Sequence, residues 1–451
     1  MSKDLKITKG VNIPLKGKAE QLIGNANQPK VFAVKPTDFV GLFPKLHVKE
    51  GVEVKAGDPL IYSKDDNRIQ WVSPVSGEVV EIERGDKRKM LAVKILADSN
   101  TSYREFPVES PVEMAREAIV KRLLDSGCWP FLRQRPYGTI ASPDDTPKSI
   151  FISCINTAPL SADQDFVVHG QEENFHTGIE ALKKLTDGKV HLTVTGMSTP
   201  SYVFKKTKGV DIHKVSGPHP AGNVGVHIHQ IDPILKNSDK VWYLNPQDVI
   251  IIGRLFKEGK YDPTRVVALT GPQVKNPRYY KMLIGAQITP YVDGQVEGDN
   301  NRYISGDVLT GSKISHEGFL GFYDEEITVL EEGNEPEIFG WIKPGGNKFS
   351  ISRSLFTWVF PKKTLNLDTS MHGEERAFVV TGEYERVFPF DIYPVQLLKS
   401  IMIEDIEQME KLGIYELVEE DMALCEVVCT SKIPVQETLR KGLDLAKQEL
   451  G

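Results

Sequence analysis

The chain has 451 residues, of which 40% are hydrophobic and 26% are charged, and its formal net charge is −7 at pH 7. This length exceeds what one hydrophobic core supports and predicts several domains. The acidic balance excludes nonspecific nucleic-acid binding, which needs a clustered cationic surface. Apolar runs such as 249–252 are far shorter than the roughly 20 residues of a membrane span, and residues 1–6 do not begin a signal peptide.

The cysteines indicate the compartment and limit the redox chemistry. The chain has four of them without a regular spacing, which predicts a reducing cytoplasm rather than export. Cys425 and Cys429 are four positions apart, whereas a [4Fe–4S] cluster needs four thiolates, usually three at C-x₂-C-x₂-C spacing. We therefore expect no cluster, and two small buried side chains about one helical turn apart. A zinc pair and a redox switch are the alternatives.

The first predicted elements are short strands with glycine turns. Segments 51–60 and 73–80 match two hairpin halves whose alternating apolar residues fill the space between two small sheets. This pattern resembles the barrel-sandwich hybrid of biotinyl and lipoyl carriers. At the turn where a carrier has its modified lysine, this chain has Asp66 and Asn67, and Lys64 lies off the tip. We therefore expect a docking module rather than a carrier.

The next part of the chain alternates strands and helices. This alternation predicts a Rossmann-like parallel sheet that is covered by helices on both faces. No G-x-G-x-x-G motif follows a strand, so the usual pyrophosphate-binding loop is missing. The expected strands are 150–154, 190–194 and 210–215, and the expected helices are 112–124, 174–185 and 246–257.

Histidines concentrate between residues 213 and 229. His227 and His229 would share one face of an extended segment, and His213 and His219 could approach each other. A zinc site needs three or four ligands with oriented partners, and no carboxylate partner is evident nearby. We expect no metal there. His219, His227 and His229 are instead expected to stabilise a Gly/Pro-rich loop or to contact a ligand.

The last segments predict a β-grasp unit and a helical tail. Segments 264–274, 281–288 and 302–311 indicate a strand, a short helix and strands joined by glycine turns. Segments 394–412 and 434–450 have apolar residues at helical spacing, with charged residues on the opposite face. The tail around Cys425 is therefore expected to be helical.

Five regions in this order resemble the NqrA family, which provides one subunit of the bacterial Na⁺-translocating NADH:quinone oxidoreductase, and the chain matches this family nearly end to end. They are 9–17, 73–77 with 84–88, 217–222, 305–311 and 423–429. The resemblance implies a multidomain α+β and α/β fold. Its expected parts are a barrel-sandwich hybrid at 1–105, a Rossmann-like α/β domain at 112–260, a soluble-ligand-binding β-grasp (SLBB) domain at 261–330, a β-rich connecting region at 331–390 and a C-terminal helical domain of degenerate iron–sulfur type at 391–451.

The resemblance also identifies a loop that has changed. Relatives in complex I and in the Rnf complex place a G-x-G-G-A-G-F-P loop over flavin and NADH, followed by a cluster-binding arm. Here residues 126–138 carry the bulky Trp129, Phe131 and Leu132, which keep the backbone away from a phosphate. Flavin binding is therefore expected to be lost.

A quinone headgroup is the alternative ligand for this loop. Aromatic rings stack on such a ring, and guanidinium groups donate hydrogen bonds to an oxygen that gains charge on reduction. The candidate quinone-binding residues are Trp129, Phe131, Arg133, Arg135 and Pro136. In the alternative interpretation the aromatic residues are core and the arginines pair with acids or contact a neighbouring subunit.

The function that this resemblance implies is that of a peripheral subunit on the cytoplasmic side of the bacterial inner membrane. The complex couples NADH oxidation and quinone reduction to Na⁺ export. We expect no catalytic residue, covalent cofactor, cluster or metal in this chain. NADH, FMN, FAD and iron–sulfur groups would belong to partner subunits B to F, which would also make the membrane contact. The rivals are an Rnf-type electron-transfer subunit with FMN and clusters, and an autonomous soluble-ligand-binding module.

Overall fold

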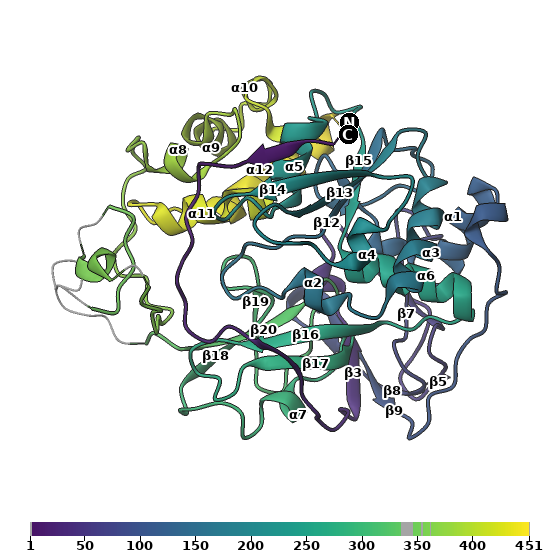
Figure 1. Ribbon diagram of the computed structural model, residues 1–451. Coiled ribbons are helices and arrows are strands. Elements are labelled where there is room, and N and C mark those ends of the chain that lie inside the picture. The colour runs from purple at the N-terminus through teal and green to yellow at the C-terminus, as the bar shows by residue number, and fades with distance from the viewer. Residues whose placement is uncertain (1, 335–345, 353–354, 361, 451) are drawn as a thin grey trace.

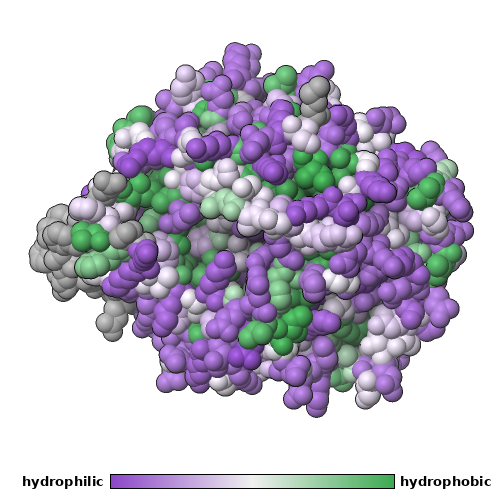
Figure 2. All heavy atoms as spheres, viewed as in Figure 1, coloured by the Kyte–Doolittle hydropathy of each residue, from purple (hydrophilic) through white to green (hydrophobic). Residues whose placement is uncertain are grey.

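The computed structural model describes residues 2–334, 346–352, 355–360 and 362–450. Two large sheets and two small ones form its β structure (Figure 1). Figure 2 shows one face of the molecule, on which hydrophilic residues dominate and hydrophobic residues form small separate groups. Within the described ranges, no helix has both the length and the apolar character needed to cross a membrane.

The α/β domain is built on a seven-stranded sheet. Its strands are β1 (Asp4–Lys6), β10 (Arg133–Arg135), β11 (Thr139–Ile140), β12 (Ser149–Ser153), β13 (Lys189–Thr195), β14 (Asp211–Ser216) and β15 (Val241–Leu244). Its helices are α1 (Arg116–Asp125), α2 (Gln164–Val167), α3 (Glu172–Lys183), α4 (Tyr202–Lys205), α5 (Val224–Ile231) and α6 (Pro246–Glu258). The strands and helices that the sequence predicts in this region are confirmed, although the first helix begins at Arg116 rather than at residue 112.

Helices cover both faces of this sheet, as the alternation predicts. Ile150 and Ile152 of β12 belong to the apolar core that includes α3 and α6, whereas Phe151 belongs to the core that includes α5. Successive side chains of a strand alternate between faces, so β12 is buried on both. The strand order is β1-β14-β13-β12-β15-β10-β11. Because β13 and β15 flank β12 on opposite sides, the sheet has a topological switch point beside β12.

The barrel-sandwich hybrid consists of the two small sheets. Its strands are β3 (Val31–Val34), β4 (Pro44–Leu46), β5 (Glu53–Val54), β6 (Pro59–Ser63), β7 (Gln70–Val72), β8 (Gly77–Arg84) and β9 (Met90–Ala97), paired as β3-β9-β8-β5 and β4-β6-β7. The turn at Asp66 and Asn67 lies against the α/β domain, because Arg68 bonds both Asp66 and Asp144 at 2.6 Å. The tip where a carrier holds its lysine is therefore tied to a neighbouring domain.

The first 23 residues contribute strands to other domains, which the sequence did not indicate. β1 lies at the edge of the α/β sheet, parallel to β14. The strand β2 (Glu20–Ile23) is exposed along its length and pairs with a strand that begins at Arg278. The positions of β1 and β2 are determined by pairing with strands that are distant in the sequence. The expected single domain at 1–105 therefore does not describe how these first strands pair. The other expected domain limits stay predictions.

The β-grasp domain contains a six-stranded sheet. Its elements are β16 (Thr264–Thr270), β17 (Arg278–Leu283), α7 (Thr289–Val292), β18 (Asn301–Ser305), β19 (Ser312–Ile314) and β20 (Glu326–Glu331), with the strand order β19-β18-β20-β16-β17-β2. The short helix expected within 281–288 is wrong. Residues 278–283 pair antiparallel with β16 and bury Tyr279 and Met282, so pairing overrides the local pattern, and the helix begins at Thr289.

The C-terminal domain is helical, as expected. Its helices are α8 (Glu383–Val387), α9 (Pro394–Met402), α10 (Ile406–Lys411), α11 (Glu419–Val428) and α12 (Val435–Leu450). The single helix expected at 394–412 is interrupted, because Glu404 has a φ of 58° and Asp405 caps α10 by accepting a hydrogen bond from the Gln408 N–H.

The expected β-rich connection at 331–390 is wrong for the part that the structure describes. After Glu331, the described residues of this region contain isolated bridges at Leu365 and Asp368, a 3₁₀ turn and α8, but no strand. Residues 335–345, 353–354 and 361 lie outside the described ranges.

Two buried arginines connect the domains through aspartates at helix starts. Arg135 of the α/β domain donates from Nη1 to Asp421 Oδ2 at 2.5 Å, and that oxygen also accepts the Val418 N–H at the start of α11. Arg265 of β16 bonds Asp248, whose other oxygen accepts the Asn245 N–H at the start of α6. Both arginine–aspartate pairs are fully buried. Each aspartate therefore fixes a helix start and a domain contact together.

We expect Arg135→Met to lower the free energy of unfolding by about 3–5 kcal/mol, because it leaves the buried Asp421 carboxylate without its partner. Urea unfolding measures this loss. The exposed pair of Arg386 and Glu383 gives the control, since Arg386→Met is expected to change stability by less than about 1 kcal/mol. Equal effects of the two substitutions would contradict the role assigned to Arg135.

Candidate functional site

A polar cleft of about 100 Å³ lies at the switch point of the α/β sheet. Ser153 ends β12 and Asn245 follows β15, so the cleft lies at the carboxyl ends of the two strands that flank the switch point. Asp307 of the β-grasp domain and Glu420 of α11 also line it. Three domains therefore build a single cleft at the position where open α/β sheets bind ligands.

Arg133 is the residue of the expected quinone set that lines this cleft. Its guanidinium carbon lies 4.6 Å from the ring centre of Tyr243 and 4.5 Å from that of Tyr323. Its Nη2 donates to Asn245 Oδ1 at 3.3 Å, and its buried Nε has no hydrogen-bond partner among the residues that the structure describes. Arg133 is therefore held between two aromatic rings at the wall of the cleft.

The aromatic members of that set lie in the core instead. Trp129 and Phe131 have no exposed surface. Trp129 donates from Nε1 to the Ala141 carbonyl at 2.8 Å, and Phe131 stacks on Phe322 with ring centres 4.8 Å apart. Neither ring is free to stack on a ligand, so these positions match the alternative interpretation in which the aromatic residues are core.

The last two members of the set are also buried. The Arg135 side chain is 0% exposed, and besides Asp421 it bonds Glu420 Oε1 at 2.8 Å and the Glu416 carbonyl at 2.7 Å. Pro136 follows it through a cis peptide bond. Arg135 thus acts as the alternative interpretation predicts, by pairing with acids.

His227 and His229 do not lie in an extended segment, because both are part of α5. A buried His227 bonds the Thr193 hydroxyl at 2.9 Å and the Ala221 carbonyl at 2.7 Å, and burial lowers its pKa to about 4. His229 has a carboxylate partner after all, since its Nδ1 lies 2.7 Å from Glu416 Oε2. Glu416 is 187 residues away along the chain, so local sequence carried no signal for this contact.

His219 lines the cleft together with Arg133. Its side chain is nearly buried, and burial lowers its pKa to about 4, so the ring is neutral at pH 7. The Thr157 hydroxyl oxygen accepts the Gly222 N–H at 2.8 Å and lies 3.2 Å from His219 Nδ1. Two expected ligand-contact residues from different segments therefore meet at one site.

Buried acids next to the cleft were missed by the sequence analysis. Asp324, Glu325 and Glu326 immediately precede or begin β20, and burial raises the pKa of all three. Glu325 lines the cleft and accepts a hydrogen bond from Gln164 Nε2 at 2.5 Å, while Gln164 Oε1 is buried without a partner in the described part of the chain. The sequence signal that could have indicated these buried acids is a run of three consecutive acidic residues immediately followed by apolar residues of the strand.

All four cysteines are free thiols and all are buried. Cys425 lies in α11, and Cys429 is the residue that ends this helix. Burial raises the pKa of Cys425, and Cys429 Sγ accepts a hydrogen bond from the Ile433 N–H at 3.4 Å. The expectation of two small buried side chains about one turn apart is confirmed.

Comparison with known proteins identifies the family. A model described as the NqrA N-terminal barrel-sandwich hybrid domain matches residues 5–98, one described as the NqrA second alpha/beta domain matches 114–261, and one described as the NQRA C-terminal domain matches 266–316. The NqrA subunit of the Na(+)-translocating NADH-quinone reductase of Pasteurella multocida is 40% identical over 98% of this chain and 99% of its own length. The chain belongs to the NqrA family.

Other members agree with this assignment. The NqrA protein of Alcanivorax borkumensis is 38% identical over 99% of the chain and all of its own length, and that of Klebsiella pneumoniae is 39% identical over 99% of the chain. A solved NAD⁺-reducing [NiFe]-hydrogenase covers 76% of the chain, and the chain covers 64% of it, at 12% identity. Its TM-score of 0.39 is too low to support a shared fold. The expected family, and the fold class that it implies, are thus confirmed.

The buried Glu326 gives a pH-dependent prediction. Because burial raises its pKa in the folded state, its contribution to stability is fully present below its ordinary pKa of 4.5 and is lost as the pH rises through the folded value. Glu326→Gln resembles the protonated form and retains an oxygen for the Ala162 N–H. We expect the variant to melt several degrees above the parent at pH 8, and the two to converge near pH 4.

Thermal unfolding followed at both pH values measures this difference. The exposed Glu331 at the end of the same strand provides the control, because Glu331→Gln changes a side chain that remains in water. A constant offset between the parent and Glu326→Gln at all pH values would contradict the ionisation argument.

Proposed function

We propose that the chain is a peripheral subunit on the cytoplasmic side of the membrane which carries no redox group of its own, positions subunits B to F, and contacts quinone. The observation that carries this proposal is the cleft at the switch point, which is small, polar and built from three domains. Such a site joins domains and admits a compact ligand. The free, buried thiols of the chain fit a reducing compartment.

The absence of a resident flavin is proposed from the packing around residues 126–138. A volume of about 100 Å³ lies below the roughly 300–1,000 Å³ of pockets that enclose a whole drug-sized ligand. The 3₁₀ turn Trp129–Phe131 fills its surroundings with core side chains where a glycine loop would cradle phosphate. NADH, FMN, FAD and iron–sulfur groups are accordingly proposed for the partner subunits.

The quinone contact is proposed for the headgroup alone, with the isoprenoid tail outside. Arg133 and His219 both line the cleft. A guanidinium group and a neutral imidazole N–H are suitable donors to a quinone carbonyl oxygen, which gains charge on reduction. Trp129, Phe131, Arg135 and Pro136 would support this wall from behind rather than touch the ligand.

The cofactor content of the isolated chain tests the first part. We expect a colourless protein with neither flavin in the acid extract nor iron by elemental analysis, because the described residues offer no loop or thiol set that could hold either group. Flavin or iron at one equivalent per chain would refute this part and favour the Rnf-type alternative.

The quinone contact is tested by Arg133→Met and His219→Leu in the assembled complex. Each is expected to raise the KM for a short-chain quinone at least about 10-fold, because each removes a polar donor from a largely buried site. Arg84→Met, at the exposed end of β8, is the matched control. If both cleft variants fold and retain the parental KM, the quinone contact at this cleft is wrong, whereas the scaffold role would remain.

A further inference from the structure

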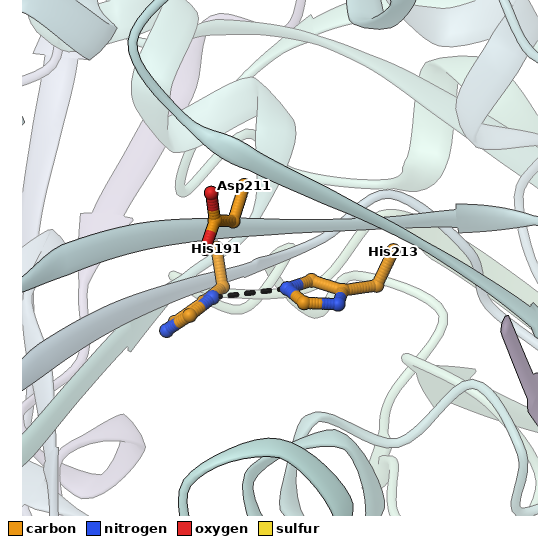
Figure 3. Close-up of side chains that lie close together, drawn as sticks. All are labelled: His191, Asp211 and His213. Carbon is orange, nitrogen blue, oxygen red and sulfur yellow. Dashed lines mark hydrogen bonds between the residues drawn. The ribbon is translucent and has the colours of Figure 1, made fainter. Parts of the chain in front are cut away.

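A second polar cluster lies in the α/β domain, on the adjacent strands β13 and β14. His191 of β13 and Asp211 of β14 are direct partners in the parallel register, and His213 lies two residues further along β14. Side chains at alternate positions point to the same face of a sheet. The three side chains therefore gather on one face of two adjacent strands, as Figure 3 shows.

The ligand atoms of these three residues are close together. His191 Nδ1 lies 3.0 Å from His213 Nε2, and one nitrogen of each ring and one carboxylate oxygen of Asp211 lie within 4.8 Å of one another. Figure 3 shows the two imidazole rings pointing toward each other from neighbouring strands. Both histidines are buried, whereas Asp211 is half-buried. The rings are thus fixed in place, and water can reach the carboxylate.

The hydrogen bonds determine which nitrogen carries each proton. The Lys3 N–H donates to His213 Nδ1 at 3.0 Å. His213 Nδ1 is therefore an acceptor, and the proton of this neutral ring is on Nε2, which donates it to His191 Nδ1. The lone pair of His191 Nδ1 consequently points into the space that the three residues share.

We propose that His191 Nδ1, His213 Nε2 and an oxygen of Asp211 form a binding site for a divalent transition-metal ion of the zinc class. Two imidazoles and one carboxylate are an established protein ligand set for Zn²⁺, and water from the exposed side completes a tetrahedral shell. The site lies apart from the switch-point cleft and does not depend on the function proposed for it.

Metal binding requires three local changes. His213 coordinates through Nε2 once its ring proton has moved to Nδ1, and the Lys3 N–H must then turn away from that atom. The Lys189–Asp211 ion pair, at 2.7 Å, must also release an oxygen, but the Lys189 side chain is 60% exposed and such surface pairs contribute little. Binding therefore couples the metal to the residues that lead into β1.

The test is a Co²⁺ titration of the purified full chain after chelator treatment, followed by the visible absorption of tetrahedral cobalt and by competition with Zn²⁺. We expect one Co²⁺ per chain, displaced by Zn²⁺. His191→Ala and Asp211→Asn should each weaken binding at least about 10-fold, because each removes one of three protein ligands. The exposed His316–Asp293 pair supplies the control, and His316→Ala should leave binding unchanged.

Several results would overturn the proposal. One is the absence of tetrahedral cobalt absorption from the parent chain. Another is unchanged affinity in both His191→Ala and Asp211→Asn. A third is an equal loss in His316→Ala, which would indicate adventitious surface binding. If His191→Ala fails to fold, Asp211→Asn decides the question, because it keeps the size of a half-buried side chain and its thermal unfolding can be checked separately.

Discussion

The arrangement of the domains depends on two buried guanidinium groups, Arg135 and Arg265, each bonded to an aspartate at the start of a helix. Asp421 and Asp248 are the third residues of α11 and α6, and each also accepts the backbone N–H at the helix start. A charged hydrogen bond of this kind is strong where water is excluded, but a buried charge without its partner is very unfavourable. The domains therefore have one arrangement in which all four charges are compensated.

The geometry of the cleft follows from these contacts. Glu420 precedes Asp421, Arg133 lies two residues before Arg135 on β10, and Asn245 begins the helix that Asp248 stabilises. Each of these lining residues is thus within a few positions of an interdomain bond. The buried acids before β20 lie on the β-grasp side, and burial keeps their pKa values raised. The cleft is accordingly a product of domain assembly, and no single domain contains it.

The segment around residues 126–138 contributes both to the core of the α/β domain and to its contact with the C-terminal helices. In this chain its aromatic residues fill the core beside the switch point, and its second arginine joins the α/β domain to the C-terminal helices. This segment therefore joins two domains.

Motifs that resemble the NqrA family indicated the family and the order of domain types. Apolar periodicity and glycine turns are local properties, and these patterns predicted most strands and helices of the α/β domain. They also pointed to Arg133 and His219 as residues of a site. Three-dimensional packing was needed to establish that these two meet, that β1 and β2 join distant sheets, and that Trp129 and Phe131 are core. Burial and pairing depend on residues that are distant in the sequence. Glu416 bonds His229, and Asp421 pairs with Arg135, and because the partners are so far apart along the chain no local pattern predicts either contact.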